Sequence, residues 1–231
     1  KAYYDDNIKV VTQLGRRYFI AVHQDSIGYI ELLQGNLDKA EELYRSSLEI
    51  YQALEHGHGI GMSLANLGHV ALMRGELHLA EQLLRQGLDH QLEVKEPWGI
   101  TVCLKKIGLV AIQEGKLEKA AHCWRQGLGL SLQFLLVPEA LEILVYLARL
   151  DEQQGQRCRA LQTLNIIQGN PSLPQEMTTI LEEQLDRLMH TCSGEELNKA
   201  RQVKSAVEVK NWIEDAFGIQ PLRIDQITLP V

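Results

Sequence analysis

The chain has 231 residues, of which 45% are hydrophobic, and a formal net charge of −7 at pH 7. An acidic chain repels nucleic acid and anionic membranes, so neither is expected to be its main partner. Its apolar runs are shorter than the roughly 18 residues of a membrane span, and no signal peptide opens the sequence. Composition therefore favours a cytoplasmic protein with ample material for an apolar core.

The cysteines do not form a closely spaced pair. This spacing favours buried thiols in a reducing compartment over a disulfide framework or a zinc site. We therefore expect a cytoplasmic chain without a cofactor or a metal. The four residues are Cys103, Cys123, Cys158 and Cys192.

A six-residue pattern, Gly-Xaa-Leu-Xaa-Xaa-Ala, returns every 40 residues without an insertion, the fourth time with Arg in place of Leu. A fixed period of this size is typical of stacked repeats. Because a left-handed glycine commonly ends a helix, each repeat is predicted to be a helical hairpin whose first helix stops at this glycine. The glycines are Gly35, Gly75, Gly115 and Gly155.

A second column of small residues lies seven positions before each of these glycines. Glycine inside a helix costs roughly 0.8 to 1 kcal/mol relative to alanine, so this column predicts a neighbouring helix that is too close to admit a Cβ. The facing helix supplies the alanine of the six-residue pattern. The column holds Gly28, Gly68, Gly108 and Ala148.

The expected elements follow in chain order. Residues 1 to 14 fit the second helix of a truncated repeat, and full repeats follow at about 15–54, 55–94, 95–134 and 135–168, the first with helices near 17–34 and 37–54. Half a repeat would leave an apolar face uncovered. We therefore expect a piece of a longer protein that can self-associate through this end. The uncovered residues would be Tyr3, Tyr4, Ile8 and Val11.

After the repeats, residues 169–217 are expected to form capping helices. A helix at about 174–191 follows the turn from Gly169 to Pro174. Ser193 and Glu196 form a capping box that opens another helix. The tail, residues 218–231, contains two prolines and is expected to be extended.

These columns resemble the tetratricopeptide repeat, in which Leu-Gly is followed by Ala twelve residues after the Gly and by a large apolar residue four later. Gly28 and Ala40 have this spacing, and Tyr44, Leu84 and Trp124 hold the large position. The usual repeat has 34 residues, so this is a longer variant. The resemblance implies an all-α, right-handed solenoid of helical hairpins with a C-terminal helical cap.

The sequence offers little catalytic chemistry. The Gly-rich stretch from Gly57 to Gly61 lacks the Lys-Ser/Thr and the preceding strand of a phosphate loop. His56 and His58 have no third metal ligand nearby in the sequence. Cys123 follows His122 but occupies an apolar helix column, which favours packing over catalysis. We therefore predict a non-enzymatic chain.

In tetratricopeptide repeats the first helix of each hairpin lines a concave groove, and its groove-facing places lie two and three residues before the column glycine and one after it. A mixed aromatic, amide and basic lining suits an extended peptide or a polar ligand, although a simple solvated helix face is the alternative. The candidate residues are Asp25, Ser26, Tyr29, Asn66, His69, Lys105, Lys106, Leu109, Tyr146 and Arg149.

A closer resemblance is to the 40-residue repeats at the C-terminus of bacterial STAND-class signalling ATPases and related regulators. Their run of Gly-Ile, Ser-Leu, Asn-Leu-Gly, Gly and Ala is similar to Gly59 through Ala80. The segment from Leu181 to Ala200 also resembles their helical end, although the Trp and Gly often found between their last two helices are absent. This implies a sensor or regulatory arm with an effector domain, such as an ATPase or a DNA-binding domain, upstream in the same polypeptide.

Two functions stay open. The first is a signalling module that binds a protein or peptide in the groove and contacts an upstream domain of its own polypeptide. The second is a structural adaptor or scaffold that mediates assembly or self-association, as in eukaryotic polarity adaptors. The subset of the family that clamps a C-terminal carboxylate is disfavoured, because Asp25 and Tyr29 occupy its early Lys and Asn places.

Overall fold

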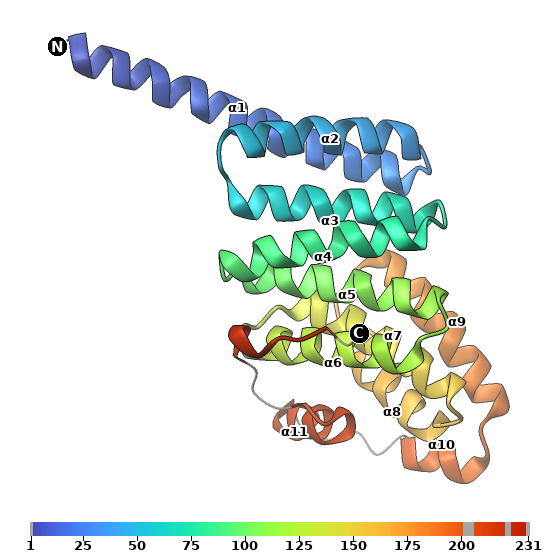
Figure 1. Cartoon of the computed structure of the whole chain (residues 1–231). Coiled ribbons are helices and arrows are strands. Elements are labelled where there is room, and N and C mark those ends of the chain that lie inside the picture. Colours follow the sequence, from blue (N-terminus) through green and yellow to red (C-terminus); the bar gives the residue numbers. More distant parts are fainter. Residues whose placement is uncertain (1, 201–205, 220–222, 230–231) are drawn as a thin grey trace. The chain divides into compact units, whose positions relative to one another are not determined.

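The computed structural model describes the backbone of residues 2–200, 206–219 and 223–229. It describes the side chains of residues 13–198, 200, 211–219 and 223–229. Within these ranges all regular structure is helical, and no strand occurs (Figure 1). The chain divides into two compact units, residues 1–114 and 115–231.

The first unit contains five helices in its described part. They are α1 (Ala2–Leu33), α2 (Leu37–Ala53), α3 (Gly57–Met73), α4 (Leu77–Glu93) and α5 (Pro97–Gln113). Consecutive helices pack on one another, and α3 also contacts both α1 and α5. The first helices of successive hairpins are therefore neighbours, which confirms the predicted solenoid of helical hairpins.

Helix α1 differs from the expected boundary. The sequence predicted one helix ending near residue 14 and another beginning near 17, whereas α1 runs unbroken from Ala2 to Leu33. Gly15 lies between the two expected segments, but its φ is not positive and the space around it is open, so nothing interrupts the helix. The side chains of residues 1–12, which include the expected apolar face, lie outside the described residues.

The second unit contains α6 (Leu117–Gln133), α7 (Val137–Gln153), α8 (Arg157–Ile167), α9 (Gln175–Thr191), α10 (Gly194–Ala200), α11 (Ala206–Phe217) and a short 3-10 turn, η1 (Ile224–Gln226). Helix α7 packs on α6, α8 and α9, and α8 also contacts α9, α10 and α11. Ser193 and Glu196 make the predicted capping box at α10, with reciprocal bonds of 2.7 and 3.3 Å. The division of the chain into repeats, cap and tail stays a prediction.

The turns inside the hairpins have the predicted left-handed glycine. Gly35, Gly75, Gly115 and Gly155 have φ between 76° and 79°. At the first of them, the Asn36 N–H donates to the Glu31 carbonyl at 2.9 Å and the Gly35 N–H donates to the Leu32 carbonyl at 3.0 Å. This pair of bonds satisfies carbonyls at the helix end in the manner of a Schellman motif.

The column glycines lie where two helices approach closely. A Cβ on Gly28 would lie 2.8 Å from the Tyr44 ring. A Cβ on Gly68 would lie 2.8 Å from Leu84 Cγ and 3.2 Å from the Ala80 carbonyl oxygen. The contact of Gly68 with the partner helix of its own hairpin is thus confirmed.

A second set of glycines was not predicted as a packing feature. A Cβ on Gly87 of α4 would lie 2.8 Å from the Gly61 carbonyl oxygen and 3.2 Å from the Ala65 nitrogen of α3. A Cβ on Gly59 of α3 would likewise lie 2.4 Å from the Tyr51 ring. The Gly-rich stretch from Gly57 to Gly61 is therefore the start of a closely packed helix.

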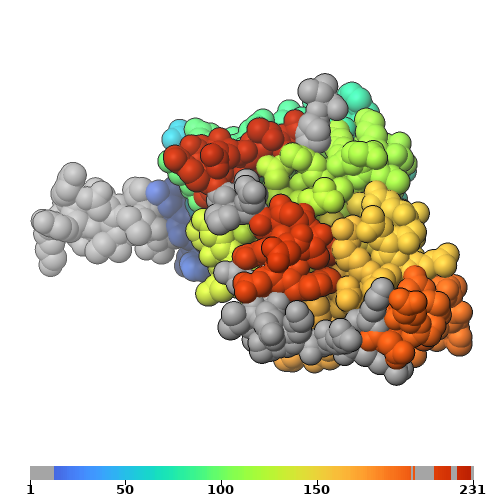
Figure 2. Space-filling view, turned by 90° about the horizontal axis from the view of Figure 1, so that it is seen from below, coloured from blue at the N-terminus to red at the C-terminus, as the bar shows by residue number. Residues whose placement is uncertain are grey.

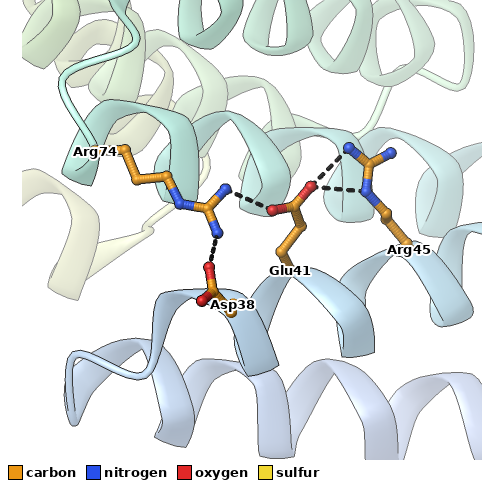
Figure 3. A network of polar contacts seen from close by, with 4 residues as sticks. All are labelled: Asp38, Glu41, Arg45 and Arg74. Carbon is orange, nitrogen blue, oxygen red and sulfur yellow. Dashed lines mark hydrogen bonds and ion pairs between the residues drawn. The ribbon is translucent and has the colours of Figure 1, made fainter.

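A network of ion pairs connects the end of α3 to the start of α2 (Figure 3). Arg74 donates to Glu41 and to Asp38 at 2.5 Å each, and Glu41 also accepts from Arg45. The hydrogen bond from Arg74, followed by that from Arg45, lowers the pKa of Glu41. The network is therefore fully formed above the ordinary carboxyl pKa and weakens as the pH falls through the lowered value.

Arg159 of α8 joins three parts of the second unit. Its guanidinium pairs with Asp151 of α7, whose exposed fraction is 3%. It also donates to the Ala216 carbonyl at 3.1 Å and lies 5.5 Å from the centre of the Phe217 ring, both at the end of α11. A single side chain therefore neutralises a buried carboxylate and anchors the last helix.

Candidate functional site

Helices α3 and α5 bring four of the predicted groove residues together. Lys106 of α5 donates to the side-chain oxygen of Asn66 of α3 at 3.1 Å and to the Ala65 carbonyl at 3.4 Å. His69 lies one turn after Asn66, within electrostatic reach of Lys105 and Lys106. We call Asn66, His69, Lys105 and Lys106 the α3–α5 cluster.

The imidazole of His69 is held neutral in this cluster. Burial, followed by the positive charges of Lys106 and Lys105, lowers the pKa of His69 from 6.5 to about 3. A neutral imidazole provides one hydrogen-bond donor and one acceptor. The cluster therefore combines two ammonium groups, an amide and an uncharged imidazole.

This shift predicts a pH dependence of folding. Above pH 6.5 His69 is neutral in both states, so its full contribution to stability is present. Between pH 6.5 and about 3 the unfolded chain takes up a proton that the folded chain does not, and stability falls. Stability measured by urea unfolding should therefore drop more steeply from pH 7 to 5 in the native chain than in His69→Gln. Equal slopes for the two chains would contradict a half-buried imidazole that is held neutral in the folded chain.

Asp25 is half-buried, and its carboxylate is turned toward neighbouring helices. It accepts hydrogen bonds from Ser47 of α2 at 2.5 Å and from Ser63 of α3 at 3.5 Å. Burial raises its pKa, although the hydroxyl groups of Ser47, Tyr51 and Ser63 oppose this shift. Asp25 therefore helps to join α1, α2 and α3 at the edge of the predicted groove.

The other groove positions of the first unit vary in exposure. Tyr29 is 50% exposed on α1, whereas Leu109 on α5 is half-buried. Ser26 is exposed and donates to the Val22 carbonyl of its own helix at 2.9 Å. Tyr29 is thus the candidate aromatic surface of the first unit.

The remaining two groove positions lie on α7 in the second unit. Tyr146 stacks on Trp124 of α6, with ring centres 5.3 Å apart and an angle of 20° between the planes. Arg149 is exposed. Stacking on a buried tryptophan fixes the orientation of Tyr146.

A row of aromatic and imidazole rings at one end of the first unit was not predicted. His56 lies 5.2 Å from Tyr18 and 6.2 Å from His58, and His58 lies 6.1 Å from Trp98. His56 Nδ1 accepts the Gly59 N–H at 3.0 Å, so its proton is on Nε2 and it caps α3. Among the described residues, no three His, Cys, Asp or Glu side chains could hold a metal together.

The cysteines only partly match the expectation of four buried thiols. Cys103 and Cys123 are buried, and burial raises the pKa of the Cys103 thiol to about 12. Cys158, at the start of α8, and Cys192, just after α9, are half-buried. No free thiolate is expected at Cys103.

The repeat columns and the contacts between first helices agree with the comparison of the chain with protein families. Residues 19–170 match the model of the MalT-like TPR region. The chain belongs to this family. Tetratricopeptide repeats generally mediate protein–protein interactions and are generally non-catalytic. None of the curated proteins compared with the chain matches it.

Two solved structures resemble the MalT-like TPR chain. The crystal structure of BtubC (BKLC) from P. vanneervenii has a TM-score of 0.65 and 15% sequence identity, and the match covers 99% of this chain and 90% of that one. PilF from Pseudomonas aeruginosa has a TM-score of 0.45 and 16% identity, with 87% and 94% covered. The similarity to BtubC extends to the fold alone.

Across the described residues, no helix is both long and apolar enough to span a membrane.

Proposed function

We propose that this chain is a non-enzymatic module that binds a protein or peptide through the α3–α5 cluster. The observation that carries the proposal is the gathering of Lys105 and Lys106 beside Asn66 and a neutral His69, on the adjacent first helices of an acidic chain. Such a surface favours an extended segment that presents carboxylate or carbonyl oxygens.

The chemistry of each group supports a main-chain or carboxylate ligand. Lys106 holds the oxygen of the Asn66 amide, which fixes the orientation of that side chain. His69 adds a donor and an acceptor without adding charge. Tyr29 on α1, which contacts α3, provides an aromatic surface for an apolar side chain of the ligand.

We further propose that the module is the sensor or regulatory arm of a larger cytoplasmic signalling protein, either a STAND-type ATPase or a transcriptional regulator. The run from Gly59 to Ala80 and the family match over residues 19–170 support this parentage. In this role the ligand would act by preferring one conformation of the arm over another.

A scaffold function is favoured by a different observation. Helix α1 exposes several large apolar side chains, a feature of surfaces that pack against another protein. If α1 is an assembly surface, Ile27→Glu should abolish concentration-dependent self-association in sedimentation experiments. A native chain that stays monomeric across the concentration range would contradict the scaffold function. The exposed residues are Leu14, Phe19, Ile20, Ile27, Tyr29, Ile30 and Leu33.

Site-specific photo-crosslinking tests the binding function. A photoreactive phenylalanine analogue replaces Tyr29 in one variant and Gln82, exposed on α4, in a matched control. We expect a defined protein or peptide product at Tyr29 only, and its loss when Lys106→Met is added without loss of helicity. Equal products at both positions, or a product unaffected by Lys106→Met, would place binding elsewhere.

A further inference from the structure

The C-terminal segment of the chain lies against helix α6 in an extended conformation. After the turn η1, Ile227 has φ −70° and ψ 126°, which is extended backbone. Thr228 then contacts α6, where Figure 1 shows the segment in red, and Figure 2 shows the same segment on the surface of the molecule. The second unit therefore already holds one extended peptide.

In the described part of this segment, three hydrogen bonds join it to α6, and each goes to the main chain of Thr228. Gln126 Nε2 donates to the Thr228 carbonyl at 2.6 Å, and the Thr228 N–H donates to Gln126 Oε1 at 3.0 Å. His122 Nε2 lies 3.1 Å from the same carbonyl. A carbonyl only accepts, so His122 carries its proton on Nε2. The Gln126 amide thus pairs with both main-chain groups of Thr228, as a residue of a neighbouring strand would.

The contact does not depend on the side chain of the bound residue. Thr228 itself is exposed, whereas Gln126 is only 6% exposed. Gln86, which occupies the same repeat position 40 residues earlier, is exposed. The place of Gln126 in the repeat does not by itself account for its burial. The site requires an N–H at the recognised residue and so excludes proline there.

We propose that the face of α6 around His122 and Gln126 is a second binding site, which takes an extended segment of a partner protein by its main chain. The C-terminal segment of the chain occupies this site and must be displaced before the partner binds. This site goes beyond the proposed function, since it lies on α6 and uses none of the α3–α5 cluster.

Displacement is feasible because the bonds that the described part of the segment makes to α6 lie at a single residue, Thr228. A segment tethered to its own site competes with an effective concentration on the order of millimolar. A free peptide should therefore bind poorly to the native chain. It should bind far better to a chain whose own segment can no longer pair with Gln126.

The test uses the full chain and a fluorescent peptide of residues 223–229. Thr228→Pro removes the N–H that donates to Gln126 and frees the site in the chain. We expect the peptide to bind this variant at least about tenfold more tightly than the native chain. Adding Gln126→Ala should abolish binding, and adding Gln86→Ala should not. A peptide with proline at the position of Thr228 should not bind at all.

Each other result contradicts the proposal. A peptide that binds neither chain shows that α6 is not a peptide site. Equal affinity for the native chain and Thr228→Pro shows that the tail does not occupy the site. Binding that survives Gln126→Ala shows that the amide is not the recognition group. These outcomes leave the proposed function intact, because the α3–α5 cluster is unchanged in all of these variants.

Discussion

Arg159→Ala should lower the free energy of unfolding of the second unit by about 3 to 5 kcal/mol, because it leaves the buried carboxylate of Asp151 without a counter-charge. It also removes the donor to the Ala216 carbonyl and the contact with the Phe217 ring, so α11 should detach. Urea unfolding followed by tryptophan fluorescence measures both effects, since Trp212 lies in α11.

The matched control is Arg187→Ala. Arg187 pairs with Glu152 at 3.5 Å, but its side chain is 52% exposed. An exposed pair contributes only about 0 to 1 kcal/mol, so this variant should unfold almost as the native chain does. Adding Asp151→Ala to Arg159→Ala should restore part of the lost stability. Similar losses for Arg159→Ala and Arg187→Ala would refute the special role of the buried pair.

Gly87→Ala should lower the free energy of unfolding by about 1 to 3 kcal/mol through overpacking. Alanine is a better helix former than glycine by roughly 1 kcal/mol, so helix propensity alone would predict that this variant is more stable. The loss is expected because the new Cβ would lie 2.8 Å from the Gly61 carbonyl oxygen, which cannot move without moving α3. Gly68→Val should have a similar effect against Leu84 and the Ala80 carbonyl.

Gly15→Ala provides the control with the opposite sign. Gly15 lies in α1, and among the described residues a new Cβ there would have no neighbour within 4 Å beyond the adjacent backbone of its own helix. Alanine should therefore stabilise the chain by up to about 1 kcal/mol. Thermal unfolding of the three variants distinguishes the two effects. A rise in melting temperature for Gly87→Ala would show that α3 and α4 do not approach as closely as described.

Most of the fold could be predicted from the sequence, because each repeat position has a local physical requirement. A left-handed turn requires glycine at Gly35 and Gly75, and a close helix contact requires it at Gly28 and Gly68. The helix ends expected near residues 34, 37 and 54 in the first hairpin also lie within about two residues of the observed ends, a usual uncertainty for such boundaries.

Other features carried weaker local signals. The turns between hairpins contain left-handed residues that are not glycine: Glu55, Lys95 and Leu135, with φ between 51° and 57°. Nothing about these residue types indicates a left-handed conformation. Helix α1 continues through Gly15, but a glycine in the sequence is compatible with either a continuous helix or a break. Sequence patterns therefore missed the left-handed residues between hairpins and wrongly divided α1 near Gly15, where the helix is continuous.

The candidate site was predicted only in part. The family spacing put Asn66 and Lys106 on adjacent helices, but it did not indicate that they bond or that His69 is neutral. The contact between Gln126 and Thr228 joins residues 102 apart in the sequence. Long-range polar contacts of this kind depend on how the chain returns on itself, and periodicity contains no information about that.

The most direct test of binding at the α3–α5 cluster is the affinity of the partner captured at Tyr29, measured by titration calorimetry. Loss of a hydrogen bond to a charged group is worth about 1.5 to 3 kcal/mol, so Lys106→Met should weaken binding about tenfold or more. Arg17→Met, which removes an exposed cation on α1, should change the affinity less than about twofold. Equal affinities of the native chain and Lys106→Met would contradict the α3–α5 cluster as the binding surface.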